Sequence, residues 1–171
     1  MTEPRLRHVQ CLSSAGLHGM AYWEWGDATN PRVLLCVHGL ARQGRDFDTL
    51  AQALCQDYRV VCPDVVGRGR SDRLADAALY QLPTYVADMV TLLARLDAGT
   101  LHWVGTSMGG LIGMGLASLP GNPVGKLVLN DVGPVIQAQA ITRIAGYLGR
   151  PGHWATVEAA ADDLLRISPF G

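Results

Sequence analysis

The residues with the clearest chemical potential form the motif GTSMG at positions 105–109. The motif stands between the apolar stretch TLHWV and MGGLIGMGLAS, a segment of small residues that suits a buried helix. A serine on a sharp turn between a strand and a helix is held in a strained conformation, and the flanking glycines avoid clashes with neighbouring elements. The first N–H groups of the helix favour negative charge that develops beside the hydroxyl. The pattern therefore predicts Ser107 as a catalytic nucleophile.

A second candidate segment is His38-Gly39-Leu40, at the end of the apolar run VLLCVHG. A loop in this position can place the backbone N–H of Leu40 beside that of Met108, and two such donors form an oxyanion hole. Gly39 would allow the backbone to approach a substrate closely. For His38 we expect a structural role, bracing the loop, rather than proton transfer.

An activated serine also needs an acid and a base, whose order along the chain differs between hydrolase families. Asp131 ends the apolar segment KLVLND, where neighbouring parallel strands bring their carboxyl ends together. It is a candidate acid, and a carboxylate that caps a loop is the other interpretation. His153 is the only histidine after Ser107, but it follows no predicted strand, so we expect it on the surface or in a lid.

The segment PDVVGRGRSD, residues 63–72, is another glycine-punctuated loop after an apolar strand. It is a weak phosphate cradle, because no Lys-Ser or Lys-Thr pair closes it and GxGxxG is absent. Its charged side chains are expected to form a local network of ion pairs and turns: Asp64, Arg68, Arg70 and Asp72. No spacing in the sequence is typical of a metal site, and no motif indicates a cofactor.

The elements that would position these residues alternate along the chain. Strands are predicted at 5–12, 20–25, 33–39, 59–64, 100–105 and 126–131, and helices at about 46–56, 83–97, 108–118, 135–148 and 155–167. This alternation favours an α/β fold, in which a mostly parallel central sheet has helices on both faces. On one face of the first helix we expect Phe47, Leu50, Ala51 and Leu54, and on one face of the second Val86, Met89, Val90 and Leu93.

Composition excludes several other functions. The 171 residues carry 14 Lys+Arg against 15 Asp+Glu, and the basic residues are scattered along the chain. This balance gives no electrostatic basis for binding nucleic acid or an anionic membrane. Residues 98–125 carry no charge, but His102 and the prolines and glycines favour a buried strand and helix over a membrane span. The cysteines form no CxxC pair, so we expect reduced thiols and a cytoplasmic protein: Cys11, Cys36, Cys55 and Cys62.

Four segments together resemble the α/β-hydrolase fold superfamily, over roughly residues 18–135 and in the expected order: VLLCVHGL, RVVCPDVVGRGRSD, WVGTSMGGLIGMGLA and KLVLNDVGP. They are similar to the subgroup of small esterases, lactonases and carbon–carbon bond hydrolases. The resemblance implies Ser107 as the nucleophile and the N–H groups of Leu40 and Met108 as the oxyanion hole. Arg68 stands where family members often carry histidine in a GHGxS segment.

The resemblance also implies a domain division. Residues 1–134 would be the N-terminal part of the hydrolase core, and residues 135–171 the beginning of a helical lid. Members of the superfamily continue past the lid to their last strands. We therefore expect the catalytic histidine, and the acid if it is not Asp131, beyond residue 171, with the sheet cut short.

Two hypotheses of different classes remain open. The first is a serine hydrolase of carboxylic esters, lactones or related small carbonyl substrates, which works through an acyl-enzyme on Ser107. The second is a catalytically inactive protein that keeps the fold for binding or assembly, because serine is a weak nucleophile without a base. A dinucleotide-binding domain is disfavoured, since no glycine fingerprint follows the first strand.

The expected partner is a small-molecule substrate, with neither nucleic acid nor membrane involved. A sheet that lacks its last strands would leave an open edge beside residues 126–131. Such an edge exposes unpaired backbone groups, which predicts self-association or pairing with a C-terminal fragment there.

Overall fold

The structure, a computed structural model, describes residues 3–135 and 153–167. The chain divides into two compact units, Met1–Pro134 and Val135–Gly171. The described part of the second unit contains the helix α5 (Val157–Ile167), which agrees with the helix predicted at 155–167. The helix predicted at 135–148 lies outside the described residues. The interpretation of this unit as a lid stays a prediction.

A six-stranded sheet forms the centre of the first unit, in the order β1-β2-β4-β3-β5-β6. Its strands are β1 (Arg5–Ser13), β2 (Gly16–Trp25), β3 (Arg32–Val37), β4 (Arg59–Pro63), β5 (Thr100–Thr106) and β6 (Val124–Asn130). β1 and β2 pair antiparallel, as do β2 and β4, whereas the remaining neighbours pair in parallel. The strand β2 starts earlier than predicted, because Gly16 pairs with Ser13 across a tight turn. The mostly parallel sheet is confirmed.

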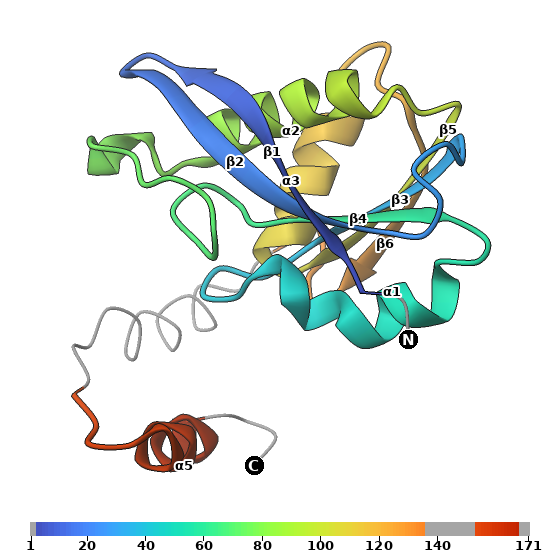
Figure 1. Cartoon of the computed structure of the whole chain (residues 1–171). Helices are drawn as coiled ribbons and strands as arrows, with labels where there is room; N and C mark the ends of the chain where they lie inside the picture. Colours follow the sequence, from blue (N-terminus) through green and yellow to red (C-terminus); the bar gives the residue numbers. More distant parts are fainter. Residues whose placement is uncertain (1–2, 136–152, 168–171) are drawn as a thin grey trace. The chain divides into compact units, whose positions relative to one another are not determined.

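Helices cover both faces of this sheet, as predicted (Figure 1). On one face lie α2 (Leu82–Leu96) and α3 (Met108–Ala117), and on the other lies α1 (Asp48–Leu54), which follows a short 3-10 turn at Gly44–Phe47. Each face has its own apolar cluster. The cluster under α2 and α3 includes Met89, Leu92, Trp103 and Ile112, and the cluster under α1 includes Trp25, Cys36, Phe47 and Ala51.

Two residues of the predicted apolar helix faces are exposed. Leu50 is 36% exposed and Val90 is 47% exposed. The buried face of α2 consists of Tyr85, Asp88, Met89, Leu92 and Leu96. Where a helix has two adjacent apolar stripes with the same spacing, only its contact with the sheet decides which stripe is buried.

The uncharged stretch 98–125 contains β5, α3 and the start of β6 rather than a single long helix. Within the described ranges, no helix has the length and apolar character needed to cross a bilayer. All four cysteines are buried free thiols. The compartment of the protein stays a prediction.

Candidate functional site

The carboxyl ends of three parallel strands meet at one edge of the sheet. The register places Val37 of β3 beside Gly105 of β5, and Thr106 of β5 beside Asn130 of β6. The segments that follow these strands therefore begin next to one another. They carry the predicted site residues His38, Gly39, Leu40, Ser107, Met108 and Asp131.

Ser107 joins β5 to α3 and caps the helix with φ 51° and ψ −113°. A positive φ is rare for a residue with a side chain and costs about 1–3 kcal/mol. The backbone N–H of Ser107 donates to the carbonyl oxygen of Asn130 at 2.9 Å, and its own carbonyl accepts from Gly110 N–H at 2.9 Å. These bonds hold the strained turn from both sides. The side chain is half-buried at the start of the helix.

Glycine is required on both sides of this turn. A Cβ at Gly105 would collide with the backbone of Gly109, and a Cβ at Gly109 would collide with the carbonyl oxygen of Val37. Trp103 supports the turn, since its indole Nε1 donates to the Gly109 carbonyl at 3.0 Å. The glycine spacing of the motif therefore follows from the close packing of the α3 start against β3 and β5.

The loop after β3 lies against Ser107. A Cβ built at Gly39 would be 3.6 Å from the Cβ of Ser107. Met108 occupies the first position of α3, where a helix leaves its N–H without an internal acceptor. No residue in the described part of the chain accepts a hydrogen bond from the N–H of Met108 or of Leu40. Two free N–H groups on neighbouring segments suit an oxyanion hole, and this role of Leu40 and Met108 stays a prediction.

His38 is only 1% exposed and uses both ring nitrogens. Its Nε2 accepts from the N–H of Val65 at 3.0 Å, so Nδ1 carries the proton and donates to the Gly39 carbonyl at 2.7 Å. Burial lowers the pKa of the imidazole below its ordinary value, which keeps the ring neutral. His38 therefore braces the loop, as the sequence predicts, and has no nitrogen left to accept a proton from Ser107.

The candidate acid and base come from different units. Asp131 follows β6 with φ 55° and an exposed side chain. It is the neighbour of Asn130, whose carbonyl accepts from Ser107, so its backbone starts beside the candidate nucleophile. His153 is exposed and precedes α5 in the second unit. The acid role of Asp131 and the position of the base stay predictions.

The loop after β4 is a hydrogen-bonded network, but the ion pairs predicted within it are wrong. In the described part of the chain, its four charged residues form no ion pair with one another. Asp64 accepts from the N–H of Gly44 at 2.7 Å and of Arg70 at 2.8 Å, while Asp72 accepts from Gly19 N–H at 2.6 Å. Both carboxylates therefore accept hydrogen bonds from backbone N–H groups rather than from arginine side chains. A sequence pattern does not reveal such partners.

Arg68 reaches from this loop to both candidate oxyanion residues. Its Nε donates to the Leu40 carbonyl at 3.0 Å, and its Nη2 lies 3.9 Å from the Sδ of Met108. Its Nη1 donates to the hydroxyl of Tyr85 at 3.1 Å. Sequence analysis assigned Arg68 to the loop network alone, because residues this far apart in the chain share no local pattern. The only feature of the sequence that singled out Arg68 is that it stands where family members often carry the histidine of a GHGxS segment.

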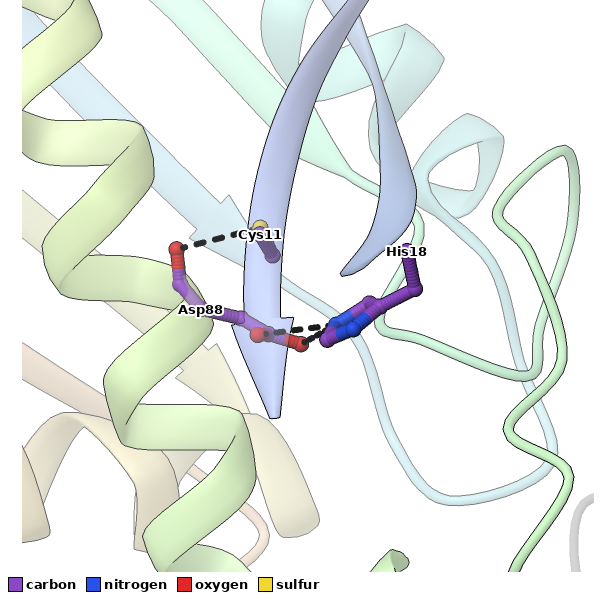
Figure 2. A group of neighbouring side chains, drawn as sticks. All are labelled: Cys11, His18 and Asp88. Atoms are coloured by element: carbon purple, nitrogen blue, oxygen red, sulfur yellow. Dashed lines mark hydrogen bonds and ion pairs between the residues drawn. The ribbon is translucent and has the colours of Figure 1, made fainter. Parts of the chain in front are cut away.

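A second polar cluster joins β1, β2 and α2 (Figure 2). The Nε2 of His18 is 3.0 Å from each carboxylate oxygen of Asp88, and the thiol of Cys11 faces the Asp88 main-chain oxygen at 4.0 Å. The potential ligand atoms of these buried residues all lie within 4.8 Å of one another. Sequence analysis found no metal spacing and missed this group, since its members come from separate elements.

The chemistry of this cluster favours a structural brace. Burial raises the pKa of the Cys11 thiol to about 12, so the sulfur stays protonated, and metals bind the thiolate. Burial also raises the pKa of the Asp88 carboxyl, against the opposing effect of His18. The hydrogen bonds of the cluster tie the β1–β2 hairpin to α2.

Comparison with known proteins identifies the family. Residues 32–158 match the alpha/beta hydrolase fold family. The chain belongs to this family. It is similar to the 3-hydroxybutyrate-oligomer hydrolase of Cupriavidus necator, at 64% identity over 166 residues that make up 97% of the chain. The chain spans 57% of the length of that relative.

Two further proteins that are similar to this chain support the family assignment. An alpha/beta hydrolase from Novosphingobium aromaticivorans has a similar structure, with a TM-score of 0.83 at 38% identity, covering 97% of this chain and 57% of that one. A serine hydrolase-like protein of Danio rerio is 35% identical over 107 residues, or 63% of this chain and 32% of that protein. The resemblance to the α/β-hydrolase superfamily is confirmed.

Proposed function

We propose that this chain carries the nucleophile and the oxyanion hole of a serine hydrolase that cleaves carboxylic esters. The observation that carries the proposal is the strained Ser107 at the start of α3, directly against the Gly39 loop. The free N–H groups of Leu40 and Met108 lie on the segments that flank it. Relatives named as a 3-hydroxybutyrate-oligomer hydrolase and a serine hydrolase-like protein support the same class.

In the proposed reaction, the Oγ of Ser107 attacks the ester carbonyl carbon while a base accepts the hydroxyl proton. The carbonyl oxygen takes up the electron pair, and the N–H groups of Leu40 and Met108 stabilise the resulting oxyanion. The intermediate collapses, the alcohol leaves with the proton from the base, and the acyl group stays on Ser107. Water then gives a proton to the same base and attacks the acyl carbon, and the intermediate collapses to release the carboxylic acid as the base returns that proton to the Oγ of Ser107.

The base is the group that the described residues of the first unit do not supply. Both nitrogens of His38 are bonded, and His18 is buried against Asp88. His8 lies on β1 at the far edge of the sheet, and His102 lies near the start of β5, at the opposite end from Ser107. We therefore assign the role to His153 or to a histidine outside these 171 residues.

As substrates we propose oligomers of 3-hydroxybutyrate. The support is the Cupriavidus necator relative, which is 64% identical across 97% of this chain. These oligomers are linear esters of a hydroxy acid, so they suit acyl transfer to a serine.

Labelling with a fluorophosphonate probe tests the nucleophile, because such a probe reacts only with an activated serine. When the base lies within the 171 residues, intact mass and peptide mapping should place the label on Ser107. Ser107→Ala should abolish labelling, while Ser118→Ala, at the exposed end of the same helix, should leave it unchanged. If labelling occurs, its loss in His153→Ala identifies His153 as the base.

A catalytically inactive binding protein is the second candidate function. The observation in its favour is that no described residue forms a hydrogen bond with the Oγ of Ser107. In that case a folded chain takes no label, and it binds a 3-hydroxybutyrate dimer equally well with or without the Ser107 hydroxyl. A labelled Ser107 would eliminate this alternative.

A further inference from the structure

Arg68 forms no ion pair with a carboxylate in the described part of the chain. Across residues 3–135 and 153–167 the ion pairs involve other basic side chains: Arg5, His18, Arg42, Arg45 and Arg59. Arg68 is half-buried, and its guanidinium carbon lies 5.8 Å from the ring centre of Tyr80 and 5.3 Å from that of Tyr85. The aromatic faces attract the cation but do not cancel its charge.

The hydrogen-bond donors of Arg68 are only partly used. Its Nε donates to the Leu40 carbonyl at 3.0 Å. Its Nη1 donates to the Val66 carbonyl at 2.9 Å and to the Tyr85 hydroxyl at 3.1 Å. For Nη2, the one contact within the described ranges is the thioether of Met108 at 3.9 Å, and a thioether is a weak acceptor. A fixed guanidinium therefore has donor capacity left for a ligand.

The Nη2 group of Arg68 lies next to the candidate oxyanion residues. The same side chain contacts Leu40 and Met108, the residues whose N–H groups would hold the carbonyl oxygen of an ester. A group bound at Nη2 would therefore lie close to the scissile bond. A guanidinium binds a carboxylate better than it binds a neutral ester, because the bond is charge-assisted.

We propose that Arg68 binds the terminal carboxylate of the substrate, and that this chain selects esters whose leaving alcohol carries a carboxylate. The inference rests on the proposed function and names its substrate class. In an oligomer of 3-hydroxybutyrate, a single CH(CH₃)–CH₂ unit separates the last ester oxygen from the free carboxylate. When that ester occupies the oxyanion hole, the carboxylate is within reach of a cation on the adjoining loop.

This assignment also determines which ester bond is cleaved. With the carboxylate on Arg68, the last ester of the oligomer lies at Ser107, and each cycle releases one hydroxy acid from the carboxyl end. An internal ester would instead place an uncharged group against the half-buried guanidinium, which would lose hydration without gaining a charged partner. Dimers and short oligomers are therefore preferred over long polymers.

The test compares binding of the 3-hydroxybutyrate dimer with binding of its methyl ester. The 171-residue chain with Ser107→Ala prevents turnover, and NMR titration of the Leu40 and Met108 amides reports binding at the site. Adding Arg68→Gln should weaken binding of the acid about tenfold, from the loss of a charge-assisted hydrogen bond, and leave the methyl ester unchanged. Arg70→Gln, at an exposed arginine of the same loop, is the matched control and should affect neither compound.

Equal losses for the acid and the methyl ester would overturn the inference, since Arg68 would then only brace the Leu40 loop. Failure of the parent chain to prefer the acid would overturn it as well. Added salt should weaken binding of the acid alone. Neither overturning result affects the proposed function, which depends on labelling of Ser107. Conversely, an unlabelled chain with a tenfold Arg68 effect supports the carboxylate site and rules out a working base within these 171 residues.

Discussion

Gly39 and Ser107 lie so close together that a methyl group on the glycine would touch the serine side chain. A Cβ at Gly39 would be 3.6 Å from the Cβ of Ser107, and its other neighbours, Arg42 and Thr106, would be 3.8 Å away. These are ordinary van der Waals distances, so the loop can accommodate a methyl group. Gly39 is therefore not required by the fold, and the space that it leaves open lies beside the candidate nucleophile.

Gly39→Ala should separate reactivity from stability. We expect the free energy of unfolding to change by less than about 0.5 kcal/mol, because no close contact is made. The added methyl group would fill the space for the ester carbonyl, so the rate of fluorophosphonate labelling of Ser107 should fall by about tenfold or more. Labelling at the normal rate would show that substrate approaches from another side. Gly133→Ala, with nothing within 4 Å of the new Cβ, is the control.

Gly109→Ala should have the opposite effect. The new Cβ would collide with the backbone carbonyl of Val37, and neither β3 nor the start of α3 can move without breaking the sheet or the turn. Overpacking against backbone should cost about 3 kcal/mol or more in urea unfolding, or prevent folding. A loss as small as that expected for Gly133→Ala would mean that the turn is less tightly packed than its geometry indicates.

The buried His38 predicts how stability responds to acid. Burial lowers its pKa below the ordinary value of 6.5, so the unfolded chain binds a proton there at a higher pH than the folded chain. The stability from this group is present above pH 6.5 and is lost as pH falls toward the folded pKa. Comparing urea unfolding of wild type and His38→Gln from neutral to acidic pH should show a weaker pH dependence in the variant. His102→Gln, a half-buried histidine of β5, is the control, and identical slopes in wild type and His38→Gln would contradict the assignment.

The buried thiol of Cys11 predicts how the stability of the chain changes at alkaline pH. Its pKa rises from 9.0 to about 12 on folding, so above pH 9 the unfolded chain loses a proton that the folded chain keeps. Stability from this group is complete below pH 9 and declines toward pH 12, by about 1.4 kcal/mol per pH unit. Cys11→Ala should show a shallower alkaline decline than wild type in chemical unfolding. A decline of equal slope would show that the thiol is accessible to solvent base.

The open edge of the sheet predicts an assembly. In the sheet formed by the described residues β6 is an edge strand, and Val128 on it is 54% exposed. We propose that this edge pairs with a second copy of the chain or with a separate C-terminal fragment. Val128→Lys should shift the chain toward monomer in sedimentation experiments, because a lysine on an edge strand opposes pairing. Leu12→Lys, on the edge strand β1 at the other side, should leave association unchanged.

Much of the fold and part of the site follow from local sequence. The glycines around Ser107 and the apolar stretch before it predict a turn between a strand and a helix, because steric exclusion and periodicity act over a few residues. The same local signals predict the order of strands and helices in the first unit and the loop role of His38. Each of these features depends on neighbours in the chain, and the structure has them where the sequence indicates.

Contacts between distant segments were decided only by the tertiary structure. Asp88 is 70 positions from His18 and 77 from Cys11, and no spacing in the sequence connects them. Arg68 reaches Leu40 and Met108 only because β3, β4 and β5 end at the same edge of the sheet. The same is true of Leu50 and Val90, which lie on the predicted apolar helix faces but are exposed. Local sterics determine which element a residue forms, whereas the docking of elements determines which side chains meet.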